Sequence, residues 1–370
     1  MNRFLKPMLP VLFTLLLLSV SACTGAEEPD RPKNIILMIG DGMGVSQVTA
    51  GYYSNDFHLV ITEAPYVGLV DTHPATEDPD DNGVVDSAAS ATAISTGVKT
   101  LNRYIGMDPD RNPVRTILEV AHENSLATGI VASSSITHAT PASFIAHQPD
   151  RGMMEEIAAD FLETDIDLFI GGGRQYFAER EDGRDLLSEL SDKGYQVLHD
   201  IEEMKQVSSG KLAGFIADGE PPRYSEGRGD MLPEATQLAI DLLSQNENGF
   251  FLTVEGSQID WAGHNNDMDY LIEELHDFDR AVAAAVDFAR RDGNTLVIIT
   301  ADHETGGTAL NGVNLSTGEI EPGFTSGGHT GAMVPVFAFG PGAEAFSGIY
   351  HQVEIFNKQM EALGFPLESE

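Results

Sequence analysis

Mostly apolar runs alternate with amphipathic stretches along most of the chain. The runs cover residues 34–40, 126–133, 167–173, 250–254, 295–299 and 333–340. Such a run is typical of a strand that is buried on both faces, as in a parallel sheet. Between residues 271 and 289, apolar positions instead recur every three or four residues, which predicts a long helix with one face in the core. The repeated order of strand and helix predicts one large α/β domain, with helices on both faces of a mostly parallel sheet.

Weaker patterns add to this outline. A helix is expected at 112–123, where Asn112 fits the cap and Pro113 fits the first helical position. Residues 174–232 mix short amphipathic pieces with Gly, Pro and charge, so we assign no chemistry to them. Residues 305–328 are rich in Gly, Thr and Asn, which predicts a loop with little core of its own.

The first 22 residues have the composition of an export signal. Arg3 and Lys6 precede an apolar run at 11–20 that is too short to span a bilayer comfortably. The only cysteine, Cys23, follows a small-residue site, which favours a lipoprotein signal that leaves Cys23 lipidated. Ordinary cleavage after Ala22 would leave a free thiol instead. We expect a lipoprotein signal peptide at 1–22, a polar tether at 23–32 and a folded domain at 33–370.

This reading sets the expected location of the protein. It predicts export to the periplasm or the cell surface, and membrane contact only through a lipid anchor at Cys23.

The acidic composition excludes one class of partner. The chain has 58 Asp and Glu residues against 21 Lys and Arg residues, for a formal net charge of -37 at pH 7. Because nucleic acid binding needs a cationic surface, we expect no nucleic acid partner. The excess of carboxylates fits a soluble, salt-tolerant surface, carboxylates that hold cations, or both. An anionic substrate would require metal ions to invert the local field.

Polar side chains follow the predicted strands or open the helices after them. They are Asp41, His138, Thr140, Glu255, Asp260, His264, Asp302, His303 and His329. Each has an ordinary explanation, since Asp before Gly is common in turns and His138 or Thr140 fits a helix cap. Asp260 and His264 are four residues apart and face the same side of a helical turn, but this half-site for zinc is common by chance. Because ligands bind at the carboxyl ends of strands in open α/β sheets, we expect the whole set at one edge.

Residues 86–97, DSAASATAISTG, are the stretch around which this set would gather. The small residues predict a closely packed helix that ends at Gly97, with Ser87 in its first turn. Taken alone, such a serine is more often a helix cap than a nucleophile. Carboxylates and imidazoles together suit zinc, with magnesium beside it, and the absence of C-x-x-C argues against a structural zinc module.

Six blocks of sequence resemble the alkaline phosphatase family in order and spacing. They are NIILMIGDGMG, DSAASATAISTG, HATPASFIAH, VEGSQIDWAGH, TADHETGG and GGHTG. The resemblance extends from about Asn34 to Gly342, and the combination is highly specific although each block alone is not. It implies an active site at the carboxyl ends of the strands of a single catalytic domain. It also implies hydrolysis of phosphate monoesters through a phosphoserine, with release of inorganic phosphate and an alcohol.

The resemblance also implies a role for each position. Ser87 corresponds to the phosphorylated nucleophile, and Arg151 corresponds to the arginine that clamps the phosphate. The implied metals are two zinc ions and one magnesium ion. The implied ligand sets are Asp260, His264 and His329 for one zinc; Asp41, Asp302 and His303, with deprotonated Ser87, for the second; and Asp41, Thr140 and Glu255 for magnesium.

Two positions expected beside the substrate depart from the pattern of some family members. His138 stands where some members carry aspartate, which makes the third metal site less anionic. Trp261 stands where some carry lysine or histidine, which leaves Arg151 as the main side-chain contact to phosphate and loosens product binding. The excursion at 305–328 is short, so the crown-like insertion of larger relatives is minimal here. The homodimer that is usual in the family is therefore less firmly implied.

Two other functions compete with this reading. A phosphodiesterase or sulfatase of the same superfamily would share the metal edge, but sulfatases need a C/S-x-P-x-R block that DSAASAT does not match. A phosphate-binding lipoprotein on the cell surface would not need zinc ligands spread over several strands.

Overall fold

The structure is a computed structural model that describes residues 1, 31–76, 80 and 82–367. The predicted signal peptide, apart from Met1, and the predicted lipid attachment at Cys23 lie outside the described residues. Among the described helices, none combines the length and the apolar composition that a membrane crossing requires.

A ten-stranded sheet forms the centre of the molecule, in the order β14-β2-β13-β8-β1-β7-β3-β4-β6-β5. Its strands are β1 (Asn34–Gly40), β2 (Tyr66–Asp71), β3 (Ala127–Ser135), β4 (Leu168–Gly172), β5 (Gln196–Leu198), β6 (Leu212–Phe215), β7 (Phe250–Gly256), β8 (Thr295–Thr300), β13 (Val334–Phe339) and β14 (Gly348–His351). Within this sheet, β13 alone runs antiparallel to its neighbours β2 and β8. The central strands β8, β1, β7 and β3 are parallel and buried at every residue, which explains their mostly apolar sequences.

Two groups of helices cover the sheet. One group consists of α1 (Val45–Ser54), α9 (Met231–Leu243) and α11 (Met268–Asp292), in which α11 contacts the other two. The other consists of α2 (Ser87–Thr96), α3 (Ile117–Glu123), α4 (Ala139–Ala142) and α12 (Val353–Leu363), which also contact one another. Both groups contact strand β3, the first through α9 and the second through α3 and α4. This arrangement confirms the predicted single α/β domain.

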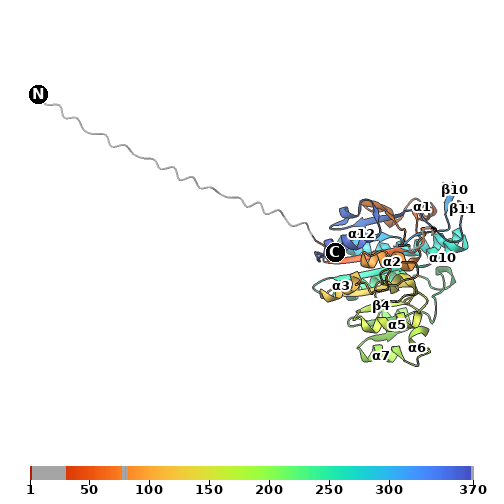
Figure 1. The fold of residues 1–370 in the computed structure, drawn as a ribbon. Helices are drawn as coiled ribbons and strands as arrows, with labels where there is room; N and C mark the ends of the chain where they lie inside the picture. Colours follow the sequence, from red (N-terminus) through yellow and green to blue (C-terminus); the bar gives the residue numbers. More distant parts are fainter. Residues whose placement is uncertain (2–30, 77–79, 81, 368–370) are drawn as a thin grey trace.

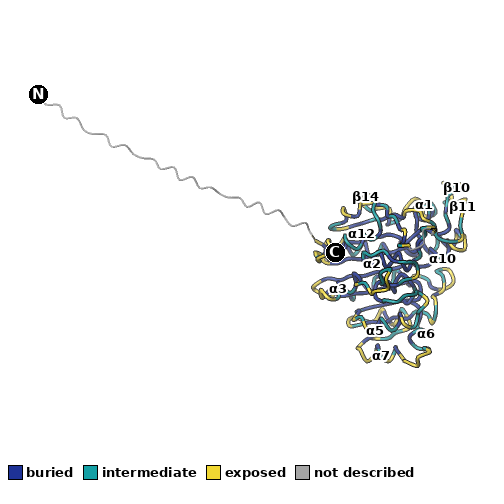
Figure 2. The backbone as a smooth tube through the Cα atoms, viewed as in Figure 1, coloured by how far each residue is buried: buried dark blue, intermediate teal, exposed yellow. Residues whose placement is uncertain are grey.

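Shorter helices complete the outer layers. α5 (Met154–Glu163), α6 (Gln175–Ala178) and α7 (Leu186–Asp192) lie together beyond β4, toward one end of the molecule (Figure 1). α8 (Ile201–Met204) packs beside β5 and β6. The backbone of the central strands is buried, and exposed residues concentrate in the outer helices and loops (Figure 2).

The helix expected to begin at Asn112 begins instead at Ile117. The amide of Asn112 donates to Asp108 Oδ1 at 2.8 Å and its side chain donates to Asp108 Oδ2 at 2.9 Å, so a turn uses the residue that looked like a cap. Thr116 caps the helix through a capping box, in which its hydroxyl accepts from the Glu119 amide at 3.2 Å and the Glu119 carboxylate accepts from the Thr116 amide at 2.8 Å.

The segment expected to be a loop at 305–328 contains a hairpin. β10 (Ala309–Val313) and β11 (Ile320–Gly323) pair antiparallel and project beside α1 (Figure 1). Below them, β9 (Glu304–Thr305) pairs with β12 (His329–Thr330), which brings the end of the excursion back to its start. The excursion is therefore short and returns to the edge at which the parallel strands end.

Candidate active site

The carboxyl ends of the central strands meet at one edge of the sheet. In the register of the sheet, Ile39 of β1 pairs with Glu255 of β7 and with Thr300 of β8. Asp41 and Asp302 each lie two residues after these positions, so their carboxylates and that of Glu255 emerge next to one another. Because β13 runs in the opposite direction, the chain that precedes it, including His329, reaches the same edge.

One cluster joins α10 (Gln258–Asn265) to β12. Asp260 and His264 lie one turn apart on α10, and His264 Nε2 is 3.3 Å from Asp260 Oδ2. His329 Nε2 is 3.5 Å from Asp260 Oδ1 and 3.2 Å from His264 Nε2. One ligand atom from each of the three residues lies within 4.8 Å of the others. Backbone carbonyls fix the orientation of both rings. His264 Nδ1 is 2.8 Å from the carbonyl oxygen of Gly327, and His329 Nδ1 is 2.8 Å from that of Val85.

A second cluster lies deeper in the site. His303 Nε2 is 3.0 Å from Asp302 Oδ2 and 3.5 Å from Asp41 Oδ1, and all three side chains are fully buried. Asp302 Oδ1 accepts from the amides of Gly42 at 3.1 Å and His303 at 2.9 Å, which leaves Oδ2 facing the cluster. The ring of His303 stacks on that of His329 with centroids 3.5 Å apart, so the two clusters are in contact.

Ser87 meets this second cluster at the start of α2. Its Oγ lies 3.2 Å from His303 Nε2. Asp86 caps the helix by accepting from the amide of Ala89 at 3.0 Å, and Gly97 ends it in a left-handed conformation with φ 73°. All ten residues of α2 are buried, which their small side chains allow. The amino end of the helix, with its partial positive charge, therefore faces the carboxylates.

A third cluster combines Asp41, Glu255 and His138, each of which offers a ligand atom within 4.8 Å of the others. Oε2 of Glu255 accepts hydrogen bonds from Ser134 at 3.2 Å and from Ser257 at 2.5 Å. The neighbouring hydroxyl of Thr140 is buried at the start of α4. The structure thus places His138 with the group predicted to hold magnesium, and not only beside the substrate.

Arg151 reaches the site from the loop before α5. Its Nη1 donates to Asp86 Oδ2 at 3.2 Å, and its Nη2 lies 3.4 Å from His138 Nε2. Asp86 Oδ2 also accepts from the backbone amide of Arg103. Asp86 therefore orients the guanidinium of Arg151 with Oδ2, while its Oδ1 caps α2. The ring of Trp261 stands edge-on to that of His138, with centroids 6.1 Å apart. All the predicted site residues therefore lie in one continuous group.

Burial and charge shift the pKa values of this group in opposite directions. Burial, together with Asp302, Asp260 and Glu255, raises the pKa of Asp41 well above its ordinary value. Burial raises the pKa of Glu255 to about 7. The Asp260 carboxylate raises the pKa of His264 to about 9, whereas burial and the charge of Arg151 lower the pKa of His138 to about 4.

The side chains fit metal ions on a structural criterion. Six buried polar atoms of the group have no hydrogen-bond partner among the described residues: Asp41 Oδ1 and Oδ2, Glu255 Oε1, Asp302 Oδ2, Thr140 Oγ1 and His138 Nδ1. A buried carboxylate oxygen without a donor is costly, and a cation removes that cost. Imidazole and carboxylate ligands suit zinc, and the oxygen atoms of Asp41, Glu255 and Thr140 suit magnesium.

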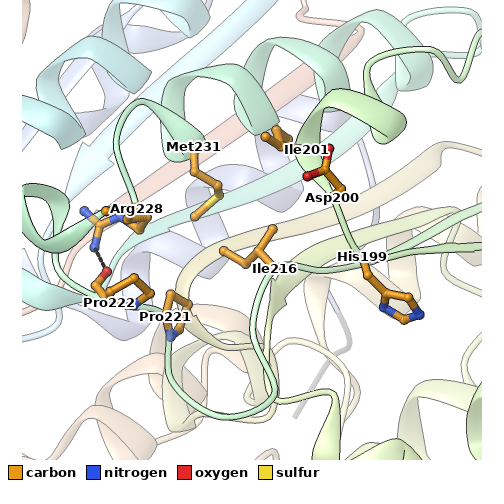
Figure 3. A pocket seen from close by; sticks show the side chains of 9 residues that line it. His199, Asp200, Ile201, Ile216, Pro221, Pro222, Arg228 and Met231 are labelled. Atoms are coloured by element: carbon orange, nitrogen blue, oxygen red, sulfur yellow. Dashed lines mark hydrogen bonds between the residues drawn. The ribbon is translucent and has the colours of Figure 1, made fainter.

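A separate cavity of about 230 Å³ lies away from this group. It is lined by His199, Ile216, Arg228, Met231 and neighbouring residues, none of which belongs to the predicted site (Figure 3).

Comparison with known proteins agrees with the geometry. A sequence model of alkaline phosphatase matches residues 32–320. The chain belongs to the alkaline phosphatase family. Alkaline phosphatase 3 of Bacillus subtilis is 35% identical to it, over 100% of this chain and 99% of that protein.

Solved structures support the same assignment. The alkaline phosphatase of the Antarctic bacterium TAB5 is 45% identical, with a TM-score of 0.85, over 92% of this chain and 100% of that one. A mutant of the TAB5 enzyme in which a histidine is replaced by glutamate was solved with Mg bound in its M3 site; it is 44% identical, with a TM-score of 0.84 over the same shares. As an alkaline phosphatase, the protein is a metal-dependent hydrolase of phosphate monoesters.

Several side chains that support this alkaline phosphatase site were not predicted from the sequence. Thr305 donates from Oγ1 to Asp260 Oδ1 at 2.5 Å and lies 3.2 Å from His303 Nδ1, so it touches both of the first two clusters. Ser134 and Ser257 hold Glu255 in the third. The one signal in the sequence is proximity, since Thr305 and Ser257 each lie two residues after a predicted ligand.

Proposed function

We propose that this alkaline phosphatase uses Ser87 as its nucleophile, with two zinc ions and one magnesium ion at the edge of the sheet. One observation carries the proposal. Ser87 Oγ lies at the amino end of α2, 3.2 Å from His303 Nε2, beside buried carboxylates that lack hydrogen-bond donors among the described residues. A serine that only capped a helix would not need buried carboxylates around it.

Each metal has its own ligands in this proposal. Asp260, His264 and His329 hold one zinc ion; Asp41, Asp302, His303 and deprotonated Ser87 hold the second; Asp41, Thr140 and Glu255 hold magnesium. When bound, these ions act as Lewis acids that lower the pKa of a ligated oxygen and neutralise the charge of the transferred phosphoryl group.

Hydrolysis then takes two displacements at phosphorus. The proton of Ser87 passes to solvent, its Oγ forms a bond to the phosphorus of the monoester, and the bond from phosphorus to the alcohol oxygen breaks, so that the alcohol leaves after its oxygen takes up a proton from solvent. Water then attacks the phosphoserine and gives up a proton, the bond from Oγ to phosphorus breaks, Ser87 takes up a proton again, and inorganic phosphate leaves. The amides at the start of α2 and the guanidinium of Arg151 favour the negative charge of the transferred group throughout.

Arg151 is the main side chain that grips the phosphate. Its planar guanidinium binds two phosphate oxygens at once, and Asp86 presets its orientation through the 3.2 Å hydrogen bond. Trp261 offers an indole where a cationic side chain would add a further charge contact. Phosphate is therefore held less tightly after the second displacement, which favours its release.

The third site has a mixed ligand set that weakens its affinity for magnesium. Magnesium prefers oxygen ligands, and the imidazole of His138 lies beside Asp41 and Glu255. Burial and Arg151 lower the pKa of His138 to about 4, so at neutral pH the ring is uncharged and suited to a softer cation. The TAB5 mutant that carries glutamate in place of a histidine, with Mg in its M3 site, fits this account.

Export is proposed from the sequence of the first 22 residues, and attachment to the membrane from Cys23. Replacement of Cys23 by serine should move the protein from the membrane fraction to the soluble fraction. We also propose a homodimer, on the resemblance to the family alone, and light scattering on the purified protein measures it.

The test of the catalytic proposal is Ser87→Ala, measured with a simple aryl phosphate in the presence of zinc and magnesium. We expect kcat to fall by roughly 10³-fold or more, because no other group replaces the nucleophile. Ser95→Ala is the matched control, since Ser95 lies on the same helix and bonds only to backbone carbonyls of Thr92 and Ser143. Near-normal turnover by Ser87→Ala would overturn the proposed mechanism, and faster hydrolysis of a diester than of the monoester would overturn the proposed substrate class.

A further inference from the structure

A second group of histidine and aspartate side chains, of the types that ligate metals, lies at the far end of the sheet, outside the active site. Asp71 is the last residue of β2, His73 follows it by two positions, and His351 is the last residue of β14. β14 pairs in parallel with β2, and His351 stands opposite Asp71 in the register, so both strands end at the same level. One ligand atom from each of the three residues lies within 4.8 Å of the others.

The three side chains are already in mutual contact. His73 Nδ1 is 2.8 Å from Asp71 Oδ2, and the rings of His73 and His351 stand edge-on with centroids 4.8 Å apart. His351 Nε2 is 3.0 Å from the carbonyl oxygen of His73. The side chains of His73 and Asp71 are 50% and 41% exposed, so an ion can reach them directly from solvent.

A cation already lies against this group. The ammonium of Lys99 contacts His73 Nε2, so the ring presents a lone pair to a positive charge. Asp71 supplies the nearest negative charge. A metal ion bound here would displace the ammonium, which sits at the end of a flexible, half-buried side chain.

We propose that Asp71, His73 and His351 form an additional binding site for Zn²⁺, separate from the catalytic metals. Two imidazoles and one carboxylate are ligands that zinc takes with a fourth position left to water. Magnesium and calcium prefer sets made of oxygen atoms alone, so this set selects against them. The bound ion links the end of β14, which is the edge strand of the sheet, to the end of β2.

The position of this site indicates what the ion does. Gln352 follows His351 and is fully buried; its amide donates to Asp71 O at 3.1 Å and its Nε2 donates to Thr72 O at 3.1 Å. Its Oε1 lies 2.7 Å from Ser90 Oγ, on the helix that begins with Ser87. A metal ion that fixes the two strand ends therefore stabilises the frame around α2 without contact with the substrate.

The zinc content of the holoenzyme tests this site. Untagged wild-type protein and a His73→Ala/His351→Ala variant are dialysed against a series of free zinc concentrations, and the bound zinc per chain is measured by mass spectrometry. We expect the variant to bind one zinc ion fewer per chain at saturation, with unchanged hydrolysis of an aryl phosphate. Equal zinc content across the whole series would overturn the proposal.

His199→Ala is the matched control. His199 is exposed and has Asp200 beside it, but the two side chains point apart, and His199 is the one histidine among the residues that line the separate cavity (Figure 3). This variant should bind as much zinc as the wild type. A loss of zinc equal to that of the double variant would show that any exposed histidine has the same effect, and would overturn the proposal.

Two further measurements do not depend on the folding of the double variant. In the wild type, zinc beyond the catalytic sites should protect His73 and His351, but not His199, from modification by diethyl pyrocarbonate. Lys99→Ala should tighten binding at this site by roughly tenfold, because the competing ammonium is removed and changes next to a metal site alter affinity by 10- to 100-fold. Absence of protection, or an unchanged affinity in Lys99→Ala, would place the ion elsewhere and overturn the proposal.

Discussion

The buried carboxyl of Glu255 should make the metal-free protein lose stability as the pH rises. Burial raises the pKa of Glu255 from its ordinary value of 4.5 to about 7. A carboxyl whose pKa is higher in the folded state holds its proton more tightly there than in the unfolded chain. The free energy of unfolding therefore falls as the pH rises from 4.5 to about 7, and it stays low above that.

The size of the effect follows from the same two pKa values. A pKa difference of about 2.5 corresponds to about 3 kcal/mol, at ~1.36 kcal/mol per unit. Glu255→Gln removes the titration and keeps an oxygen that can accept from Ser134 and Ser257. Part of this loss already occurs below pH 5, where the unfolded carboxyl begins to ionise. Compared with this variant, the metal-free wild type should therefore be roughly 2 to 3 kcal/mol less stable at pH 8 than it is at pH 5.

Urea unfolding followed by circular dichroism, in the presence of a chelator, measures this difference. Glu247→Gln, at an exposed position before β7, is the control and should follow the wild type at both pH values. With metals restored, the loss between pH 5 and pH 8 should disappear, because a bound cation favours the ionised carboxylate. If the wild type and Glu255→Gln change in parallel with pH when metal-free, the electrostatic account of the third cluster is wrong.

Four further substitutions test the rest of the site. Arg151→Ala should raise KM for an aryl phosphate by roughly 10- to 150-fold, since a hydrogen bond to a charged group contributes about 1.5–3 kcal/mol. An unchanged KM would show that Arg151 does not bind the phosphate. Trp261→Lys should lower the inhibition constant of inorganic phosphate by roughly tenfold or more. An unchanged inhibition constant would contradict the proposal that Trp261 favours release of phosphate. His138→Asp should lower the magnesium concentration needed for full activity, and an unchanged requirement would separate His138 from the third site. Thr305→Val should weaken zinc binding by roughly 10- to 100-fold, measured by chelator competition, because Asp260 loses the hydrogen bond that orients it.

The central strands could be predicted because they are buried on both faces. A strand such as β1, buried on both faces, is apolar at nearly every position, and its run in the sequence matches its bounds in the structure. The strands at the edges and in the hairpin gave no such signal, since β5 and β10 are half-exposed and short. The helix start at Asn112 was predicted wrongly. The cap pattern is local and does not show that Asp108 already holds Asn112 in a turn.

The candidate site could be predicted because its side chains follow strands that end at one edge. Asp41, Glu255 and Asp302 inherit their positions from the register of three parallel strands. The hydroxyl of Thr305 could not be predicted in the same way, because threonine is common in loops and only the folded chain brings it to Asp260. The helix within residues 86–97 was expected, but the hydrogen bond from Arg151 to Asp86 depends on a loop distant in the sequence.

Capture of the covalent intermediate tests the central claim most directly. The enzyme is incubated with a radiolabelled phosphate monoester at acidic pH, quenched in acid and digested, and the labelled peptide is sequenced. The account predicts one label, on Ser87, at the amino end of α2. A label on another residue, or complete turnover with no label on Ser87, would contradict it.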